Sequence, residues 1–272
     1  MPADLSDNMI ETDGLCFGYK EGNEILRRIT LDIEGPGLIS IIGPNGVGKT
    51  TLVHCIDRIL APTDGSVRIE GRHVGEYALK ELAKVVAYVS YTDHDAFPMT
   101  VLDSVLMGRH PVNGGKMRDE DFEIAYEALD ALGILDLALR NTDELSAGQY
   151  QKVALARGLV QDSKILLLDE PTANLDIRYQ LDVVMMMLDL ARKRGITVLM
   201  ICHDLNLASK YSDSIIMLKD GGVFAYGPPD EVITEDNIRS VYGVESVVIE
   251  DQGRPHVILR DPRLEEASRC SV

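Results

Sequence analysis

The sequence lacks any run of about 18 apolar residues, the length that a membrane-spanning helix requires. Its N-terminal segment, MPADLSDNMIETDG, is acidic, whereas a secretory signal peptide carries a positive patch and an apolar stretch. We therefore expect a cytoplasmic protein. With 272 residues, the chain is long enough for a well-buried core, in one large α/β domain or in a domain with a smaller insertion.

Cysteine is scarce, and the four cysteines at positions 16, 55, 202 and 270 show no metal-ligand spacing. Three of them lie in apolar contexts, which favours free thiols in a reducing compartment. Basic residues are also few, because 27 lysines and arginines stand against 44 acidic residues, for a formal charge of −17. This charge repels a phosphate backbone, so nucleic acid is not expected as a partner, and solubility or a salty cytoplasm explains it more simply.

Two kinds of strand pattern occur along the chain. The segments LCFGY (15–19) and ILRRITLDI (25–33) flank a turn, and apolar and polar residues alternate in the second, as in antiparallel strands with one solvated face. The short apolar runs LISII (38–42), KILLLDE (164–170) and ITVLMI (196–201) are typical of parallel strands that are buried on both faces.

Helical patterns alternate with the apolar runs, which indicates βαβ units and an α/β fold. Residues 177–194 form one such pattern, with Leu181, Val184, Leu188 and Ala191 on one face.

Between about 92 and 145 strand signals give way to helical ones, and we expect a helical insertion there. Phe122, Ala125, Leu129 and Leu132 form an apolar stripe on a helix that begins at the acidic segment RDEDFE. From about residue 236, the segments SVVIED and HVILRD flank a QGRP turn and predict a terminal β-hairpin. We thus predict a main domain over 1–235 and a C-terminal extension over 236–272.

The segment GPNGVGKTT (43–51) follows an apolar strand and precedes a helical pattern. Glycines at 43, 46 and 48 let backbone N–H groups converge on phosphate oxygens at the start of the helix. Lys49 supplies a cation, and the hydroxyl of Thr50 suits Mg²⁺. The sequence therefore predicts a phosphate-binding loop.

Two further strands end in residues that suit phosphate chemistry. Asp169 and Glu170 end the run ILLLDE, where one carboxylate approaches the Mg²⁺ at Thr50 and the other polarises an attacking water. His203 follows the run ITVLMI, at the end of a parallel strand where ligands bind in open α/β sheets.

Together, Tyr19, GPNGVGKT, LSAGQ (145–149), ILLLDEP, ANLD and His203 occur in the order found in ATP-binding-cassette (ABC) ATPases, which nearly the whole chain resembles. The resemblance implies the ABC ATPase fold: a mostly parallel P-loop sheet, an N-terminal antiparallel β subdomain and an inserted helical subdomain. It also implies ATP and Mg²⁺ as ligands, and a head-to-tail dimer in which LSAGQ closes on the partner's nucleotide. Ser146 and Gly148 then offer a hydroxyl, N–H groups and a helix start to a γ-phosphate.

By the same resemblance, Tyr19 stacks on adenine, and Thr50 and Asp169 hold the metal. Glu170 is the catalytic base, His203 and Lys49 act at the γ-phosphate, and Asp176 takes part in communication across the dimer. The implied nucleotide contacts in the two glycine motifs are Gly43, Pro44, Asn45, Gly46, Gly48, Lys49, Thr50, Thr51, Ser146, Gly148 and Gln149.

One position departs from the family pattern. A glutamine usually ends the strand that here reads VVAYVSYTDHD, and Tyr91 occupies its place. A phenol is bulkier than an amide and a poorer metal ligand. Either Thr92 or Asp93 supplies the oxygen, or Tyr91 does so through a water, or hydrolysis is slow and coupled differently; a replacement of small effect is the simplest alternative.

A single cassette without a membrane span resembles importer subunits that recruit a separate permease, at the inner face of the membrane. The segments TVLDSVLMGRHPV (100–112) and VYGVESVVIEDQGRPHVIL resemble the subgroup for iron-siderophore, haem and cobalamin uptake, which also works with a substrate-binding protein. The permease would dock near residues 91–110. The alternatives are a soluble ABC ATPase, for example in cluster assembly, and a regulatory module with little turnover.

Overall fold

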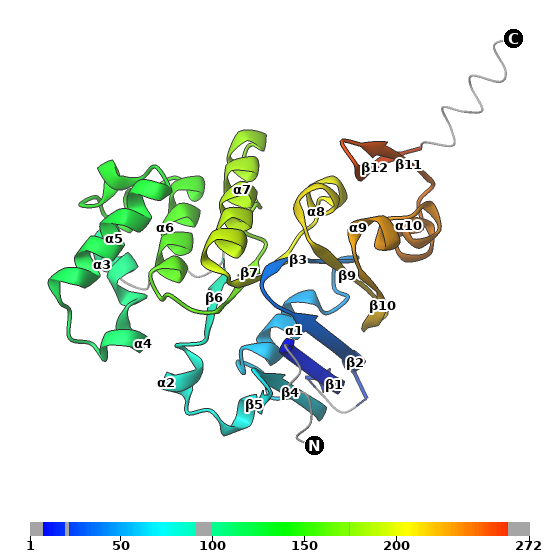
Figure 1. Ribbon diagram of the computed structural model, residues 1–272, viewed down its shortest axis with the longest axis horizontal. Coiled ribbons are helices and arrows are strands. Elements are labelled where there is room, and N and C mark those ends of the chain that lie inside the picture. Colours follow the sequence, from blue (N-terminus) through cyan, green and yellow to red (C-terminus); the bar gives the residue numbers. More distant parts are fainter. Residues whose placement is uncertain (1–7, 20–21, 91–98, 174, 261–272) are drawn as a thin grey trace, which may run out of the picture.

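The computed structural model describes residues 8–19, 22–90, 99–173 and 175–260 (Figure 1). The strands are β1 (Asn8–Gly18), β2 (Glu24–Glu34), β3 (Gly37–Ile42), β4 (Asp64–Ile69), β5 (Arg72–His73), β6 (Val86–Ser90), β7 (Ile165–Asp169), β8 (Thr197–Ile201), β9 (Ser214–Lys219), β10 (Gly222–Gly227), β11 (Ser246–Asp251) and β12 (Arg254–Leu259). The α-helices are α1 (Lys49–Ile56), α2 (Leu79–Leu82), α3 (Val101–Met107), α4 (His110–Asn113), α5 (Asp119–Ala131), α6 (Ala147–Leu159), α7 (Ile177–Arg194), α8 (Leu205–Tyr211), α9 (Pro229–Val232) and α10 (Glu235–Tyr242).

A six-stranded sheet in the order β10-β9-β3-β8-β7-β6 forms the centre of the molecule. Its pairs are parallel except for β10 with β9, which confirms the parallel strands predicted from the apolar runs. Alternate side chains of each strand enter two different cores. In β8, Val198 and Met200 pack with helices on one face. Leu199 and Ile201 pack on the other face, against α1 and the first strands of the chain.

A four-stranded antiparallel sheet, in the order β2-β1-β4-β5, covers the second core. The pairing of β1 with β2 confirms the antiparallel strands expected from the alternating pattern, with Ile29 opposite Leu15 and Leu31 opposite Thr12. Helix α1 supplies Leu52 and Val53 to the same core, so the segment after the predicted phosphate loop is fixed between the two sheets.

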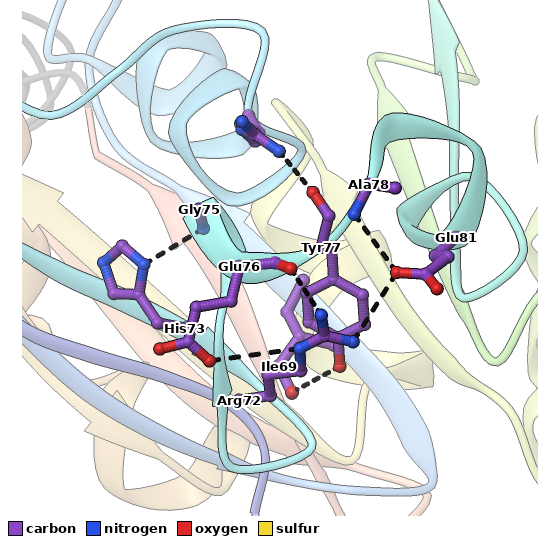
Figure 2. Close-up of polar contacts among 9 residues, drawn as sticks. Ile69, Arg72, His73, Gly75, Glu76, Tyr77, Ala78 and Glu81 are labelled. Atoms are coloured by element: carbon purple, nitrogen blue, oxygen red, sulfur yellow. Dashed lines mark hydrogen bonds and ion pairs between the residues drawn. The ribbon is translucent and has the colours of Figure 1, made fainter.

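The corner that follows β5 is held by a cluster of polar contacts (Figure 2). The guanidinium of Arg72 lies 4.2 Å from the ring centroid of Tyr77 and 3.7 Å from a carboxylate oxygen of Glu81. The Tyr77 hydroxyl donates to the carbonyl of Ile69 at 2.9 Å, and Arg58 donates to the carbonyl of Tyr77 at 2.7 Å. These contacts tie the loop before β6 to the end of the α1 segment.

Helices α3, α4, α5 and α6 lie together at one side of the molecule, away from the C-terminal hairpin (Figure 1). Ala125, Leu129 and Leu132 are buried in the core, as the apolar stripe predicts. Phe122 is exposed, however, and the neighbouring Asp121 is buried in its place, because it pairs with Arg109. Helix α7 spans the predicted 177–194, with Val184 and Ala191 buried. None of the helices in the described ranges is both long and apolar enough to cross a membrane.

Strands β11 and β12 form the hairpin predicted near the end of the chain, and it packs on α8. Asn206 of α8 donates to the carbonyl of Val257 at 3.1 Å and accepts from its N–H at 2.7 Å. The Ser209 hydroxyl donates to the carbonyl of Pro255 at 2.5 Å. The helix that follows His203 is thereby joined to the C-terminal hairpin.

Replacing Asn206 with alanine is expected to loosen this hairpin, because both backbone groups of Val257 lose their partner. The loss corresponds to about 1–3 kcal/mol of local stability. Hydrogen exchange of residues 246–259, measured by mass spectrometry, is expected to accelerate roughly tenfold. Lys210→Gln is the matched control, because its half-buried ion pair with Asp251 still reaches solvent and contributes only about 0–1 kcal/mol. Unchanged protection in Asn206→Ala would contradict the prediction.

Candidate functional site

The glycine-rich loop joins β3 to α1 and ends at the first residue of that helix. Gly48 has φ of 106°, and a Cβ there would lie 2.7 Å from Cδ2 of Leu26. Gly46 has φ of 77° and no atom within 4 Å of its Cβ position, so the loop opens to solvent at this point. The loop thus forms a hollow at the N-terminus of α1, where backbone N–H groups and the helix dipole favour an anion.

Lys49 places a cation inside this loop. Its side chain is almost buried, at 6% exposure, and Nζ donates to the carbonyls of Gly43 at 2.9 Å and Pro44 at 3.0 Å. Burial lowers the pKa of Lys49, while the charges of Glu170 and Asp169 oppose this shift. Because an ammonium group has three N–H donors and Lys49 lines the cleft, one donor remains for an anion that enters the loop.

Thr50 and Asp169 meet at the edge of the loop. The Thr50 hydroxyl lies 3.3 Å from Oδ1 of Asp169, the last residue of β7. Burial raises the pKa of Asp169, and the hydrogen bond from Thr50 opposes this shift. A hydroxyl and a carboxylate are oxygen ligands of the kind that Mg²⁺ takes, so these two residues fit that cation beside a phosphate.

Glu170 and His203 lie across the mouth of the same cleft. Glu170 follows β7 with φ of 53°, and His203 comes two residues after the neighbouring parallel strand β8. Nε2 of His203 lies 2.5 Å from Oε1 of Glu170, and the two side chains are 44% and 39% exposed. Because an ionised carboxylate only accepts, Nε2 carries the hydrogen of this bond. The cleft, of about 470 Å³, is lined by Ile25, Asn45, Gly46, Gly48, Lys49, Thr50, Thr51, Glu170 and His203.

The LSAGQ segment lies in a different hollow, of about 240 Å³, whose lining includes Ser146, Gly148 and Gln149 but no residue of the glycine-rich loop. Ser146 caps α6: its hydroxyl accepts from the N–H of Gln149 at 3.3 Å, and the Gln149 side chain accepts from the N–H of Ser146 at 3.0 Å. Asp176 likewise caps α7 by accepting from the N–H of Tyr179. Within one chain, the two glycine motifs are thus separate.

The remaining predicted residues are spread more widely. Tyr19 is 62% exposed, packs edge-to-face on Phe17 and is not part of the cleft lining. Pro44 lines an adjacent hollow. Tyr91, like Thr92 and Asp93, lies outside the described residues.

Sequence reasoning missed His54 and Tyr88, which lie close to Asp169. The available signal was the position of His54 one helical turn after Thr50, on the same face of α1.

A larger hollow, of about 660 Å³, lies between α9, α10 and the C-terminal hairpin. Asp230, Glu235, Glu250 and Arg254 contribute to its lining, which contains none of the residues predicted to bind nucleotide or metal. Among the described residues that line it, there is neither a residue of the glycine-rich loop nor Lys49, so we assign the candidate chemistry to the smaller cleft.

A phosphate-binding loop, an acidic strand end beside it and a histidine facing the same cleft define a P-loop nucleoside triphosphatase. The profile described as ABC transporter matches residues 26–173, and the chain belongs to that family. It is an ABC-type ATPase that binds nucleotide, and the α/β fold implied by the sequence motifs is confirmed.

Relatives and solved structures agree with this assignment. The chain is similar to the ferric enterobactin transport ATP-binding protein FepC of Escherichia coli K12, with 36% identity over 90% of this chain and 91% of FepC. It is 40% identical to the hemin import ATP-binding protein HmuV of Rhodopseudomonas palustris, over 87% of this chain and 89% of HmuV. A dimeric ATP-binding cassette in a post-hydrolysis state, bound to ADP and Pi, matches with a TM-score of 0.73 and 28% identity, over 81% of this chain and 98% of that one.

Proposed function

We propose that this chain is the ATP-hydrolysing subunit of a membrane importer for an iron chelate or haem. The observation that supports hydrolysis most directly is the hydrogen bond between Glu170 and His203 at the mouth of the phosphate-loop cleft. The cargo class is taken from the relatives, because FepC is named for ferric enterobactin and HmuV for hemin.

In this proposal, the loop around Gly46 binds the ATP phosphates through its N–H groups, and Lys49 lies beside the γ-phosphate. Thr50 and Asp169 would hold Mg²⁺, which supplies charge neutralisation at the phosphate oxygens when bound. Glu170 orients the attacking water and takes its proton. His203 fixes the Glu170 carboxylate and is exposed enough to reach the γ-phosphate.

Two copies of the chain complete each site head to tail. The separation of the LSAGQ hollow from the phosphate loop within one chain supports this arrangement, as does the dimeric cassette that matches this fold. The Ser146 hydroxyl accepts a bond as the helix cap and keeps its own hydrogen to donate to the partner's γ-phosphate. Asp176 and Tyr19 remain proposed contacts of the dimer and of adenine, respectively.

The helical side of the molecule is the proposed docking face for a separate permease at the inner face of the membrane. Met107 and Val112, at the ends of α3 and α4, are 48% and 40% exposed although both are apolar. The proposed ATPase domain comprises residues 1–235, and residues 236–272 form its extension. A substrate-binding protein is a further, indirect partner.

ATP between two chains favours the closed dimer, and hydrolysis reopens it.

The test combines turnover with uptake. Mg-ATP turnover by the purified chain is expected to rise faster than linearly with protein concentration, because each site needs two chains. Cells that carry the chain are expected to take up labelled ferric chelate or haem, and cells that carry Glu170→Gln are not. ATP turnover by a chain whose loss leaves uptake unchanged would favour a non-transport ATPase. Uptake of cobalamin but not of ferric chelate or haem would correct the cargo. ATP binding without turnover would favour a regulatory module.

A further inference from the structure

Both carboxylate oxygens of Asp169 are hydrogen-bonded, and by different elements. Oδ1 accepts from the Thr50 hydroxyl of α1 at 3.3 Å. Oδ2 accepts from the Tyr88 hydroxyl of β6 at 3.4 Å. The family motifs account for Thr50 and Asp169 but give no role to the phenol on the other oxygen.

The phenol of Tyr88 is itself held by a histidine. Nε2 of His54 lies 3.0 Å from the Tyr88 hydroxyl, and the two rings pack edge-to-face with centroids 5.2 Å apart. Since the Tyr88 hydrogen points to an ionised carboxylate, its oxygen is left as the acceptor, and His54 donates from Nε2. The contacts form an ordered series from His54 through Tyr88 to Asp169.

We infer that His54 and Tyr88 are positioning residues that fix the Asp169 carboxylate for the metal of the metal–ATP complex. Outer hydrogen bonds of this kind orient a carboxylate ligand and raise metal affinity. This inference rests on the proposed function, in which Asp169 serves the metal.

The residues His54, Tyr88 and Thr50 hold the Asp169 carboxylate from two sides, which restricts its rotation more than one hydrogen bond would. Thr50 and His54 lie one turn apart on α1, so this helix holds the carboxylate from one side directly and from the other through Tyr88. The register of β6 with β7 pairs Ser90 with Asp169 and Tyr88 with Leu167, so Tyr88 lies two residues before the residue opposite Asp169. Rotation of the carboxylate would break both hydrogen bonds.

The test measures metal-dependent binding rather than turnover alone. For each variant, the dissociation constant of ATPγS is measured by calorimetry, once with EDTA and once with Mn²⁺. The constant in EDTA divided by the constant in Mn²⁺ is the metal ratio, and a higher ratio means a larger contribution of the metal to binding. Tyr88→Phe removes only the hydroxyl and is expected to lower this ratio about tenfold. Loss of a hydrogen bond to a metal ligand lowers metal affinity by about 10- to 100-fold, and we expect the smaller effect because the bond from Tyr88 to Asp169 is long. Binding of ATPγS in EDTA is expected to stay within twofold.

His54 provides a rescue test. His54→Leu removes the donor and is expected to lower the ratio severalfold, whereas His54→Gln, whose amide can donate from a similar position, is expected to restore most of it. A purely structural role for His54 would not distinguish the two variants in this way. If Tyr88→Phe failed to fold, His54→Leu and His54→Gln would decide the matter by the same measurement.

Tyr77→Phe is the matched control, because it also removes a phenol hydrogen bond, here to the carbonyl of Ile69 in the corner drawn in Figure 2. Its ratio is expected to stay within twofold of the unchanged chain. Equal effects in Tyr77→Phe and Tyr88→Phe, or no effect in Tyr88→Phe, would overturn the inference. Asp169→Asn distinguishes a failure of the proposed function from a failure of the inference. If Asp169→Asn leaves the ratio unchanged, the proposed metal role of Asp169 is wrong. If Asp169→Asn lowers the ratio but Tyr88→Phe leaves it unchanged, only the inference is wrong.

Discussion

Replacing Glu170 with glutamine is expected to lower steady-state ATP turnover by at least about 100-fold, the lower range for loss of a general base. The amide has nearly the volume of the carboxylate and can still accept from His203, so the cleft keeps its shape. It cannot take a proton from water at neutral pH. Glutamine therefore removes the chemical step selectively.

Nucleotide binding by Glu170→Gln is expected to persist, because the loop N–H groups and Lys49 are untouched. Chains that bind ATP without hydrolysing it are expected to accumulate as dimers, which light scattering after gel filtration measures directly. Phosphate release under saturating Mg-ATP measures the loss of turnover.

The matched control is Glu81→Gln, on α2 in the polar corner of Figure 2, where the side chain accepts from the N–H of Ala78 at 3.1 Å. Glutamine keeps this acceptor, and turnover is expected to stay within twofold. If Glu170→Gln retained more than a tenth of the turnover, the proton would have another acceptor, and the assignment of the base would be wrong.

The sequence predicted the central sheet well, for a physical reason. Strands such as LISII are buried on both faces, so they must be continuously apolar and can be recognised without knowing their neighbours. The conformation of the glycine-rich loop was equally predictable, because its glycines meet local backbone requirements at Gly46 and Gly48.

Contacts that depend on the packing of distant elements were not predictable. Tyr88 reaches Asp169 only through the register of β6 on β7, and nothing near Tyr88 in the sequence announces that partner. The amphipathic pattern of α5 predicted Phe122 on the apolar stripe, yet Asp121 is buried, because Arg109 supplies a buried charge from the segment between α3 and α4. Periodicity records hydrophobicity but not the location of a compensating charge.

Replacing Asp121 with alanine is expected to destabilise the helical part of the molecule by about 3–5 kcal/mol, the range for breaking one side of a buried ion pair. Nε of Arg109 lies 2.8 Å from Oδ1 of Asp121, and the two side chains are only 9% and 4% exposed. Oδ2 accepts from the amide of Asn113 at 3.1 Å and from the N–H of Arg118 at 3.0 Å. Alanine would leave the Arg109 charge buried, and the carbonyl of Val160 would be its remaining hydrogen-bond partner among the described residues.

Thermal unfolding is expected to show this loss as a decrease of roughly 10 °C in Tm for a chain of this size. Asp119→Ala, at an exposed residue in the first turn of the same helix, is the control and is expected to lose only about 0.3–1 kcal/mol of dipole stabilisation. If Asp121→Ala and Asp119→Ala lowered Tm by the same amount, the buried ion pair would contribute no more to stability than a surface charge does.

In the unchanged chain, a fall in pH is expected to remove the stability that the ion pair between Arg109 and Asp121 contributes. The hydrogen bond from Arg109 holds the pKa of Asp121 below its ordinary value, although burial opposes this shift. The stabilisation is therefore complete above the unfolded-state pKa of about 3.9 and is lost as the pH falls below it through the lower folded-state pKa. Asp121→Ala should lack this part of the acid dependence.

The double replacement Arg109→Met with Asp121→Leu separates the net contribution of the pair from the cost of an unpaired charge. If desolvation nearly offsets the attraction between the two groups, the double variant is expected to recover most of the stability that Asp121→Ala loses. ATPγS binding at the distant phosphate loop should then be normal in both variants. A double variant as unstable as Asp121→Ala would instead mean that the further contacts of the pair, to Asn113, Arg118 and Val160, hold this region together.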